Sequence, residues 1–117
     1  MGVTKKTDGD IVKIYPRGIF SGGKETDELE KVVMDTAASG NTRMLVNFSE
    51  CEWLTSLPLS VFVRAHINYK NRGGDIKICG LGKRVKNVFI ITSLIKVFDH
   101  YETEEEALKA FTAMTKA

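Results

Sequence analysis

The sequence contains little cysteine and little proline, two of each among 117 residues. Cys51 and Cys79 lie far apart and form no CxxC pair, which excludes a recognisable zinc site and argues against a disulfide framework. Free cysteines usually behave as small hydrophobic residues, so we expect both to be buried, reduced and poorly reactive. Reduced thiols agree with a cytoplasmic location.

Long hydrophobic runs and an excess of one charge are also absent. No apolar stretch approaches the roughly 20 residues that span a bilayer, and residues 1–10 contain no apolar run of the kind a signal peptide needs. Seventeen Lys and Arg residues against fifteen Asp and Glu leave a net charge of +2. We therefore expect no membrane insertion and no nucleic-acid partner.

The remaining composition is that of one globular domain. Hydrophobic residues make up 43% and charged residues 27%, with no repeat and no linker that divides the chain. We expect residues 1–10 to form a flexible N-terminus and residues 11–117 to form a single domain.

Strand and helix patterns alternate along this domain. Short strands are expected at 11–15 and 18–20, separated by Pro16, with further strands at 43–48, 76–79 and 96–98. Helices are expected at 24–38, 58–72 and 83–93 and from residue 103 to the end. This order predicts the α/β class, with a mixed, mostly parallel sheet packed against helices.

The apolar positions indicate the core. Residues 43–48 form a nearly continuous apolar strand, which predicts burial on both faces of the sheet. The last helix should bury a seam of Ala107, Ala110, Phe111 and Met114. The core residues expected for one α/β sandwich are Leu45, Val46, Ile76, Ile78, Val32 and Phe111.

Residues for catalysis or metal binding do not converge in the sequence. His66 and His100 have no Ser, Cys or Asp partner at the spacing of a triad, so a structural or surface role is favoured. The acids Glu102, Glu104, Glu105 and Glu106 are typical of a solvated helix start, with Thr103 and Glu106 in a capping box. We expect no enzyme activity, no metal and no cofactor.

One glycine turn follows a strand and precedes a helix. Gly80-Leu81-Gly82 lacks the third glycine of a dinucleotide site, so a tight turn is favoured. A nucleotide or other small ligand at Gly80–Lys83 remains an alternative. The cations Lys83, Arg84 and Lys86 indicate a solvated helix face.

Thr55 and Ser56 directly precede the second predicted helix. Their hydroxyl groups are suited to capping the free backbone N–H groups of that helix. They are also suited to phosphorylation, since a phosphate would add negative charge at the helix N-terminus. Both interpretations remain open from the residues alone.

Segments along nearly the whole chain carry a family resemblance. They include Arg17-Gly18-Ile19-Phe20, the strand Met44 to Ser49, Trp53-Leu54-Thr55-Ser56, and the stretch from Gly73-Gly74 through Val97-Phe98 to Glu104-Glu105-Glu106. In order and spacing, they resemble the STAS domain of bacterial anti-sigma factor antagonists. The resemblance implies a mixed sheet with helices packed around it.

The resemblance also implies a function. It matches Ser56 to a serine that is phosphorylated by an anti-sigma factor with serine kinase activity and dephosphorylated by a serine phosphatase, with Thr55 as the alternative acceptor. The expected partner-binding residues are Ser21, Thr55, Ser56, Leu57, Leu59 and Ser60. Thr55, Leu57, Pro58 and Ser21 differ from the usual family residues. The alternative is a STAS scaffold or transport-accessory subunit that works without phosphorylation.

Overall fold

The computed structural model describes residues 2–116, and side chains as far as residue 113. In chain order the elements are β1 (Gly2–Asp8), β2 (Ile11–Phe20), α1 (Gly23–Ala38), β3 (Arg43–Asn47), β4 (Cys51–Leu54), α2 (Ser56–Asn71), β5 (Asp75–Cys79), α3 (Lys83–Ile91), a 3₁₀ turn η1 (Leu94–Lys96), β6 (Asp99–Tyr101) and α4 (Glu104–Lys116). The expected helices are confirmed to within about two residues at their starts. Among the described residues, no helix is long and apolar enough to cross a membrane.

The strands form one mixed sheet in the order β1-β2-β3-β5-β6, and β4 pairs with the far end of β2. The pair β1–β2 is antiparallel and the other pairs are parallel. Parallel neighbours require crossover connections, which α1, α2 and α3 supply. The predicted α/β class is confirmed.

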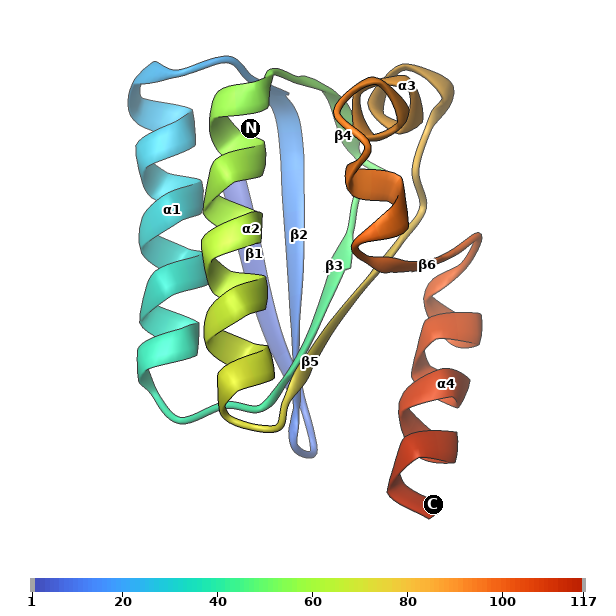
Figure 1. Ribbon diagram of the computed structural model, residues 1–117. Helices are drawn as coiled ribbons and strands as arrows, with labels where there is room; N and C mark the ends of the chain where they lie inside the picture. Colours follow the sequence, from blue (N-terminus) through green and yellow to red (C-terminus); the bar gives the residue numbers. More distant parts are fainter. Residues whose placement is uncertain (1, 117) are drawn as a thin grey trace.

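Helices cover both faces of this sheet. Helices α1 and α2 lie side by side on one face, α4 lies on the other, and α3 lies at one end of the sheet (Figure 1). Strand β3 contributes buried side chains to both faces of the sheet. Met44 and Val46 belong to the large cluster under α1 and α2, whereas Leu45 packs with α4. The expected burial of this strand on both faces is confirmed.

The expected core is divided by the sheet into two clusters. Val46, Ile76 and Ile78 belong to the cluster under α1 and α2, whereas Leu45 and Phe111 belong to the smaller cluster under α4. Val32 is only half-buried and packs at the edge of the large cluster, so its assignment to the buried core is wrong. The side chain of Met114 lies outside the described residues.

The start of the chain differs from the expectation. Residues 1–10 were predicted to be flexible. For Gly2–Asp8 this prediction is wrong, because the segment forms β1 and pairs with β2 along its whole length. Strand β1 has only weak strand character in its sequence, and its order comes from pairing with the apolar strand beside it.

Strand β2 continues through Pro16 instead of ending there. Its first part, Val12–Ile14, pairs with β3, and its last part, Gly18–Phe20, pairs with β4. Pro16 falls between these two pairings, where the sheet needs no N–H donor on that side. The two predicted short strands are therefore one strand, which pairs with β1 on one side and with β3 and β4 in succession on the other.

Two other segments also differ from the expectation. Strand β4 was not predicted, since the sequence around Thr55 reads as a turn. The strand expected at 96–98 is wrong: η1 occupies Leu94–Lys96 and the strand is Asp99–Tyr101. The 3₁₀ turn directs Phe98 into the core, where its ring packs against Phe89.

Candidate functional site

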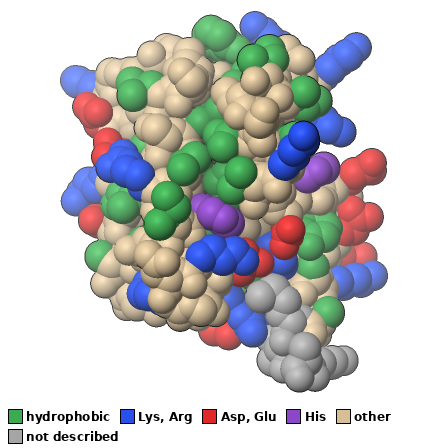
Figure 2. Space-filling model, viewed as in Figure 1, with side chains coloured by type: hydrophobic (Ala, Val, Ile, Leu, Met, Phe, Trp, Pro, Cys, Tyr) green, Lys and Arg blue, Asp and Glu red, His purple; other side chains and the backbone are tan. Residues whose placement is uncertain are grey.

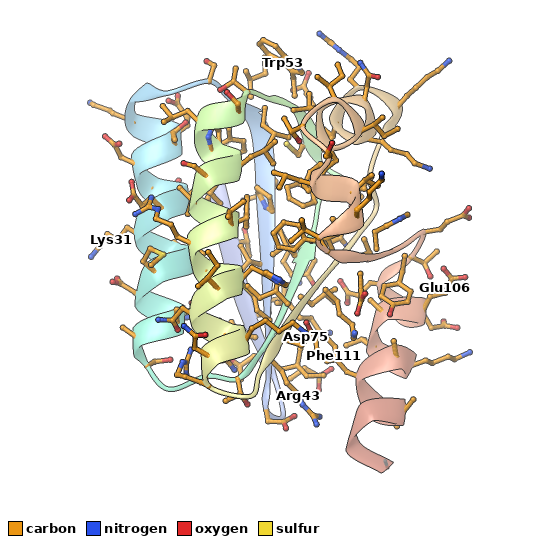
Figure 3. All side chains as sticks on the ribbon, in the orientation of Figure 1. Lys31, Arg43, Trp53, Asp75, Glu106 and Phe111 are labelled. Carbon is orange, nitrogen blue, oxygen red and sulfur yellow. The ribbon has the colours of Figure 1, made fainter. Side chains whose placement is uncertain are left out.

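The candidate site lies where β2 and β4 end and α2 begins. Phe20 and Leu54 are paired in register, and the backbone N–H of Thr55 donates to the carbonyl oxygen of Phe20 at 3.0 Å. Parallel strands end at the same edge of a sheet, so Ser21 and Thr55 emerge beside each other. Figure 3 shows Trp53, near the end of β4, at this end of the molecule.

Ser56 is the first residue of α2, and its side chain is exposed. Thr55 occupies the N-cap position with extended backbone, but its side chain makes no capping hydrogen bond. The Ser56 hydroxyl has no hydrogen-bond partner among the described residues. The capping interpretation is therefore wrong for these two hydroxyl groups, and the Ser56 hydroxyl is open to a partner.

The loop after β2 lies against the first turn of α2. The N–H of Gly22 donates to the buried hydroxyl of Thr26 at 2.8 Å, which holds the loop in place. Gly22 adopts a φ of 120°, and a Cβ built on it would lie 3.9 Å from Leu57 Cδ2. Ser21 and Leu57 thus belong to one continuous surface.

Three large apolar side chains are exposed on the elements that meet at this site. Leu57 is 58% exposed, Ile19 47% and Trp53 37%. Ile19 and Trp53 are paired in register between β2 and β4, so they share one face of the sheet. Apolar side chains of this size beside a polar rim are typical of a protein-protein contact.

The predicted partner-binding residues are not all accessible. Ser21, Ser56, Leu57 and Ser60 are exposed, and Thr55 is half-buried. The prediction that Leu59 contacts a partner is wrong, because its side chain is 1% exposed and belongs to the large core cluster. Leu59 lies three residues before Phe62, and this spacing places both on the sheet-facing side of α2.

One member of the acidic cluster has a role that the sequence did not indicate. Glu104 is half-buried; it accepts hydrogen bonds from Tyr15 at 2.7 Å and Asn47 at 3.1 Å and pairs with Lys13 at 3.1 Å. Burial raises the pKa of Glu104, but these partners outweigh burial and lower it below its ordinary value. The solvated role expected for Glu104 is therefore wrong.

The other acids at the start of α4 behave as expected. Glu102, Glu105 and Glu106 are exposed. The N–H of Glu106 donates to the hydroxyl of Thr103 at 3.2 Å, while Glu106 Oε1 accepts from the N–H of Glu102 at 3.1 Å. This reciprocal pattern is the predicted capping box, displaced by one residue on one side.

Neither histidine belongs to this site, whereas Cys51, at the start of β4, donates from its Sγ to the carbonyl oxygen of Trp53 at 3.7 Å. The ring of His66 packs edge-on against Phe98, with centroids 5.0 Å apart, and His100 is exposed. Both cysteines are free and buried, and burial raises the pKa of Cys51 to about 11 and of Cys79 to about 12. Within residues 2–116, no group of three His, Cys, Asp or Glu side chains is placed to hold a metal ion.

The glycine turn before α3 packs closely against the end of β3. Gly80 has a φ of +71°, and a Cβ there would lie 2.8 Å from Asn47 Oδ1, so only glycine fits. Gly82 then occupies the N-cap position of α3 without any side-chain bond. This geometry agrees with the interpretation of Gly80 and Gly82 as a tight turn.

Comparison with known proteins agrees with this architecture. The model of the STAS domain family matches residues 3–107. The chain belongs to the STAS domain family. The comparison with curated protein sequences gave no match.

Several solved structures share the fold. A putative anti-sigma factor antagonist from Thermotoga maritima has 22% identity and a TM-score of 0.84, with 92% of each chain covered. An anti-sigma-factor antagonist (STAS) domain protein from Planctomyces limnophilus has 18% identity and a TM-score of 0.82, covering 96% of this chain and 99% of that one. The Bacillus cell fate determinant SpoIIAA in its phosphorylated form has 15% identity and a TM-score of 0.74, covering 94% and 99%.

Proposed function

We propose that this protein is a cytoplasmic anti-sigma factor antagonist whose binding to an anti-sigma factor is switched by phosphorylation of Ser56. The anti-sigma factor is also the serine kinase, and a serine phosphatase reverses the modification. In this proposal the chain is a binding protein and a kinase substrate, not a catalyst.

The exposure and free hydroxyl group of Ser56 carry the proposal. A kinase needs an accessible hydroxyl, and among the described residues this one makes no hydrogen bond that phosphorylation would have to break. Thr55 is a poorer acceptor because it is half-buried. The similarity in fold to the phosphorylated Bacillus protein supports the assignment.

The surroundings of Ser56 explain how a phosphate would act as a switch. The N-terminus of α2 tolerates a negative charge, because its first N–H groups have no partners within the helix. The exposed apolar side chains of Leu57 and Trp53 would lie in the contact with the partner. A phosphate dianion placed there must lose water, which costs several kcal/mol unless a cation pairs with it.

The test compares the affinities of wild type, Ser56→Asp and Ser56→Ala for the cognate anti-sigma factor. A penalty of about 3 kcal/mol corresponds to an affinity at least a hundredfold lower, and this loss is expected for Ser56→Asp. Ser56→Ala should bind normally and gain no phosphate mass with kinase and ATP.

Ser60→Asp provides the matched control, because Ser60 is exposed one turn later in the same helix. It should weaken binding less than Ser56→Asp. If Ser56→Asp binds within a factor of two of wild type and neither Ser56 nor Thr55 gains phosphate, the phosphorylation-independent scaffold is the better description.

A further inference from the structure

The segment from Ile76 to Phe98 contains no Asp or Glu. It holds five of the seventeen cations, so the rest of the chain has twelve cations against fifteen acids. Lys77 is buried and paired with Asp75 and Asp99. The other four cations, Lys83, Arg84, Lys86 and Lys96, are exposed.

Helix α3 presents most of this charge on one face. Val85 and Phe89 are buried in the large core cluster and anchor the helix. The exposed side carries Lys83, Lys86, Asn87 and Ile90, which follow the i, i+3, i+4, i+7 spacing of one helix face. Together with Arg84, these residues line a surface hollow of about 410 Å³.

Within the part of the chain that the structure describes, the cations of this face have no acidic partner. Among the described residues, no carboxylate pairs with Lys83, Arg84 or Lys86. By contrast, the exposed lysines Lys31 and Lys109 each pair with an acid one helical turn away. Figure 2 shows Lys and Arg side chains projecting at the end of the molecule where α3 lies, with acidic side chains gathered below them.

The second half of α3 leaves large apolar side chains in solvent. Ile90 is 52% exposed and Ile91 is 72% exposed. The exposed surface of the helix therefore changes along its length from basic at Lys83–Lys86 to apolar at Ile90 and Ile91. A partner for this surface needs carboxylates at one end and apolar side chains at the other.

We propose that this surface, formed by Lys83, Arg84, Lys86, Ile90 and Ile91, binds an acidic amphipathic helix of a partner protein. Its carboxylates would pair with the three cations, and its apolar side chains would cover the two isoleucines. An anionic membrane is a poorer fit, because Ile90 shares a stripe with Lys83 and Lys86 whereas membrane helices separate the two types on opposite faces. The net negative charge of the rest of the chain also opposes such a membrane.

The α3 surface lies close to the Ser56 site but is a separate contact. Helix α3 packs against β4, the strand that leads to Thr55. The proposed binding does not depend on phosphorylation, so Ser56→Asp should leave it unchanged. The two proposals can therefore fail independently.

The test is an NMR titration of the full-length, ¹⁵N-labelled protein with a synthetic helical peptide of about fifteen residues that carries Glu at one end of a face and Leu at the other end of the same face. A matched peptide has Gln in place of every Glu. The acidic peptide should shift the amide signals of α3 and bind at least about tenfold more tightly than the Gln peptide. Raised salt should weaken the acidic complex.

Two variants of the surface and one control variant locate the contact. Reversal of all three cations, K83E/R84E/K86E, should reduce affinity for the acidic peptide about tenfold or more. The charge-matched control K5E/K31E/K109E, which changes exposed lysines elsewhere, should retain affinity, and I90S/I91S should lose affinity severalfold. All three should keep the circular dichroism of wild type.

Three results would overturn the proposal: shifts outside α3, equal binding of the Gln peptide, or equal loss of affinity in both triple variants. Vesicles of phosphatidylcholine with phosphatidylglycerol form the last arm. Binding to these vesicles without binding to the acidic peptide would assign the surface to a membrane instead.

Discussion

The hydroxyl group of Tyr15 donates a hydrogen bond of 2.7 Å to Oε1 of Glu104, across 89 positions of the sequence. This bond joins the centre of β2 to the first residue of α4. With Asn47 and Lys13 on the same carboxylate, it fixes the start of α4 on the second face of the sheet.

Replacing Glu104 should loosen this attachment. Hydrogen bonds to a charged group contribute about 1.5–3 kcal/mol each when buried, and Glu104 is partly exposed, so Glu104→Gln should cost about 1–2 kcal/mol. Urea unfolding at neutral pH measures this loss. Glu105→Gln, on the exposed side of the same turn, should stay within about 0.5 kcal/mol of wild type.

The lowered pKa of Glu104 also predicts acid sensitivity. A carboxyl group with a lower pKa in the folded state stabilises the fold above its ordinary pKa of about 4.3, and this stabilisation is lost as the pH falls through the lowered value. Glu104→Gln should therefore show a smaller loss of stability than wild type between neutral and acidic pH. Equal acid sensitivity of the two proteins would contradict the network.

Phe111 should be the main anchor of α4. Its side chain is fully buried and packs with Leu45, Cys79 and Ala107 between α4 and the sheet (Figure 3). Phe111→Ala should destabilise the protein by about 3–5 kcal/mol. Thermal or urea unfolding provides the measurement, and a loss below 1 kcal/mol would show that α4 is not docked as described.

The two cysteines should react slowly in the native protein. Both thiols are buried, and their raised pKa values leave little thiolate at neutral pH. A thiol reagent followed by intact mass should label both residues only after denaturation. Rapid labelling without denaturant would show that one of them is accessible.

His66 predicts a second effect of pH. Its Nδ1 is buried without a hydrogen-bond partner among the described residues. Burial and the nearby positive charge of Lys70 lower the pKa of His66, and they outweigh Asp75 and Asp99, which raise it. Because the folded pKa lies below the unfolded value of about 6.5, the contribution to stability is complete above that pH and is lost on acidification. NMR titration of the imidazole should give a pKa below 6.5.

The variant His66→Phe isolates this effect. Phenylalanine can keep the edge-on ring contact with Phe98 but cannot take up a proton. Stability measured between pH 7 and about pH 5 should fall less for His66→Phe than for wild type. If both proteins lose the same stability over this range, the titration of His66 is not responsible.

Periodicity and turn residues in the sequence were sufficient to predict the α/β class and the starts of the helices to within about two residues. Apolar residues at helical spacing, followed by Gly40, located the helix 24–38, which is α1 (Gly23–Ala38). The helix predicted at 58–72 is α2 (Ser56–Asn71), which begins two residues earlier and includes Ser56. These features depend on neighbouring residues, and the sequence contains that information directly.

The tertiary structure decided which face of each element is covered and by what. Leu59 is buried because its side of α2 faces the sheet, and Lys77 is buried because α4 covers the second face of β5. Glu104 finds its partners on β2 and β3, and Gly2–Asp8 is a strand because β2 lies beside it. Each of these outcomes depends on contacts between residues distant in the sequence, whereas periodicity identifies an apolar face and not the element that packs on it.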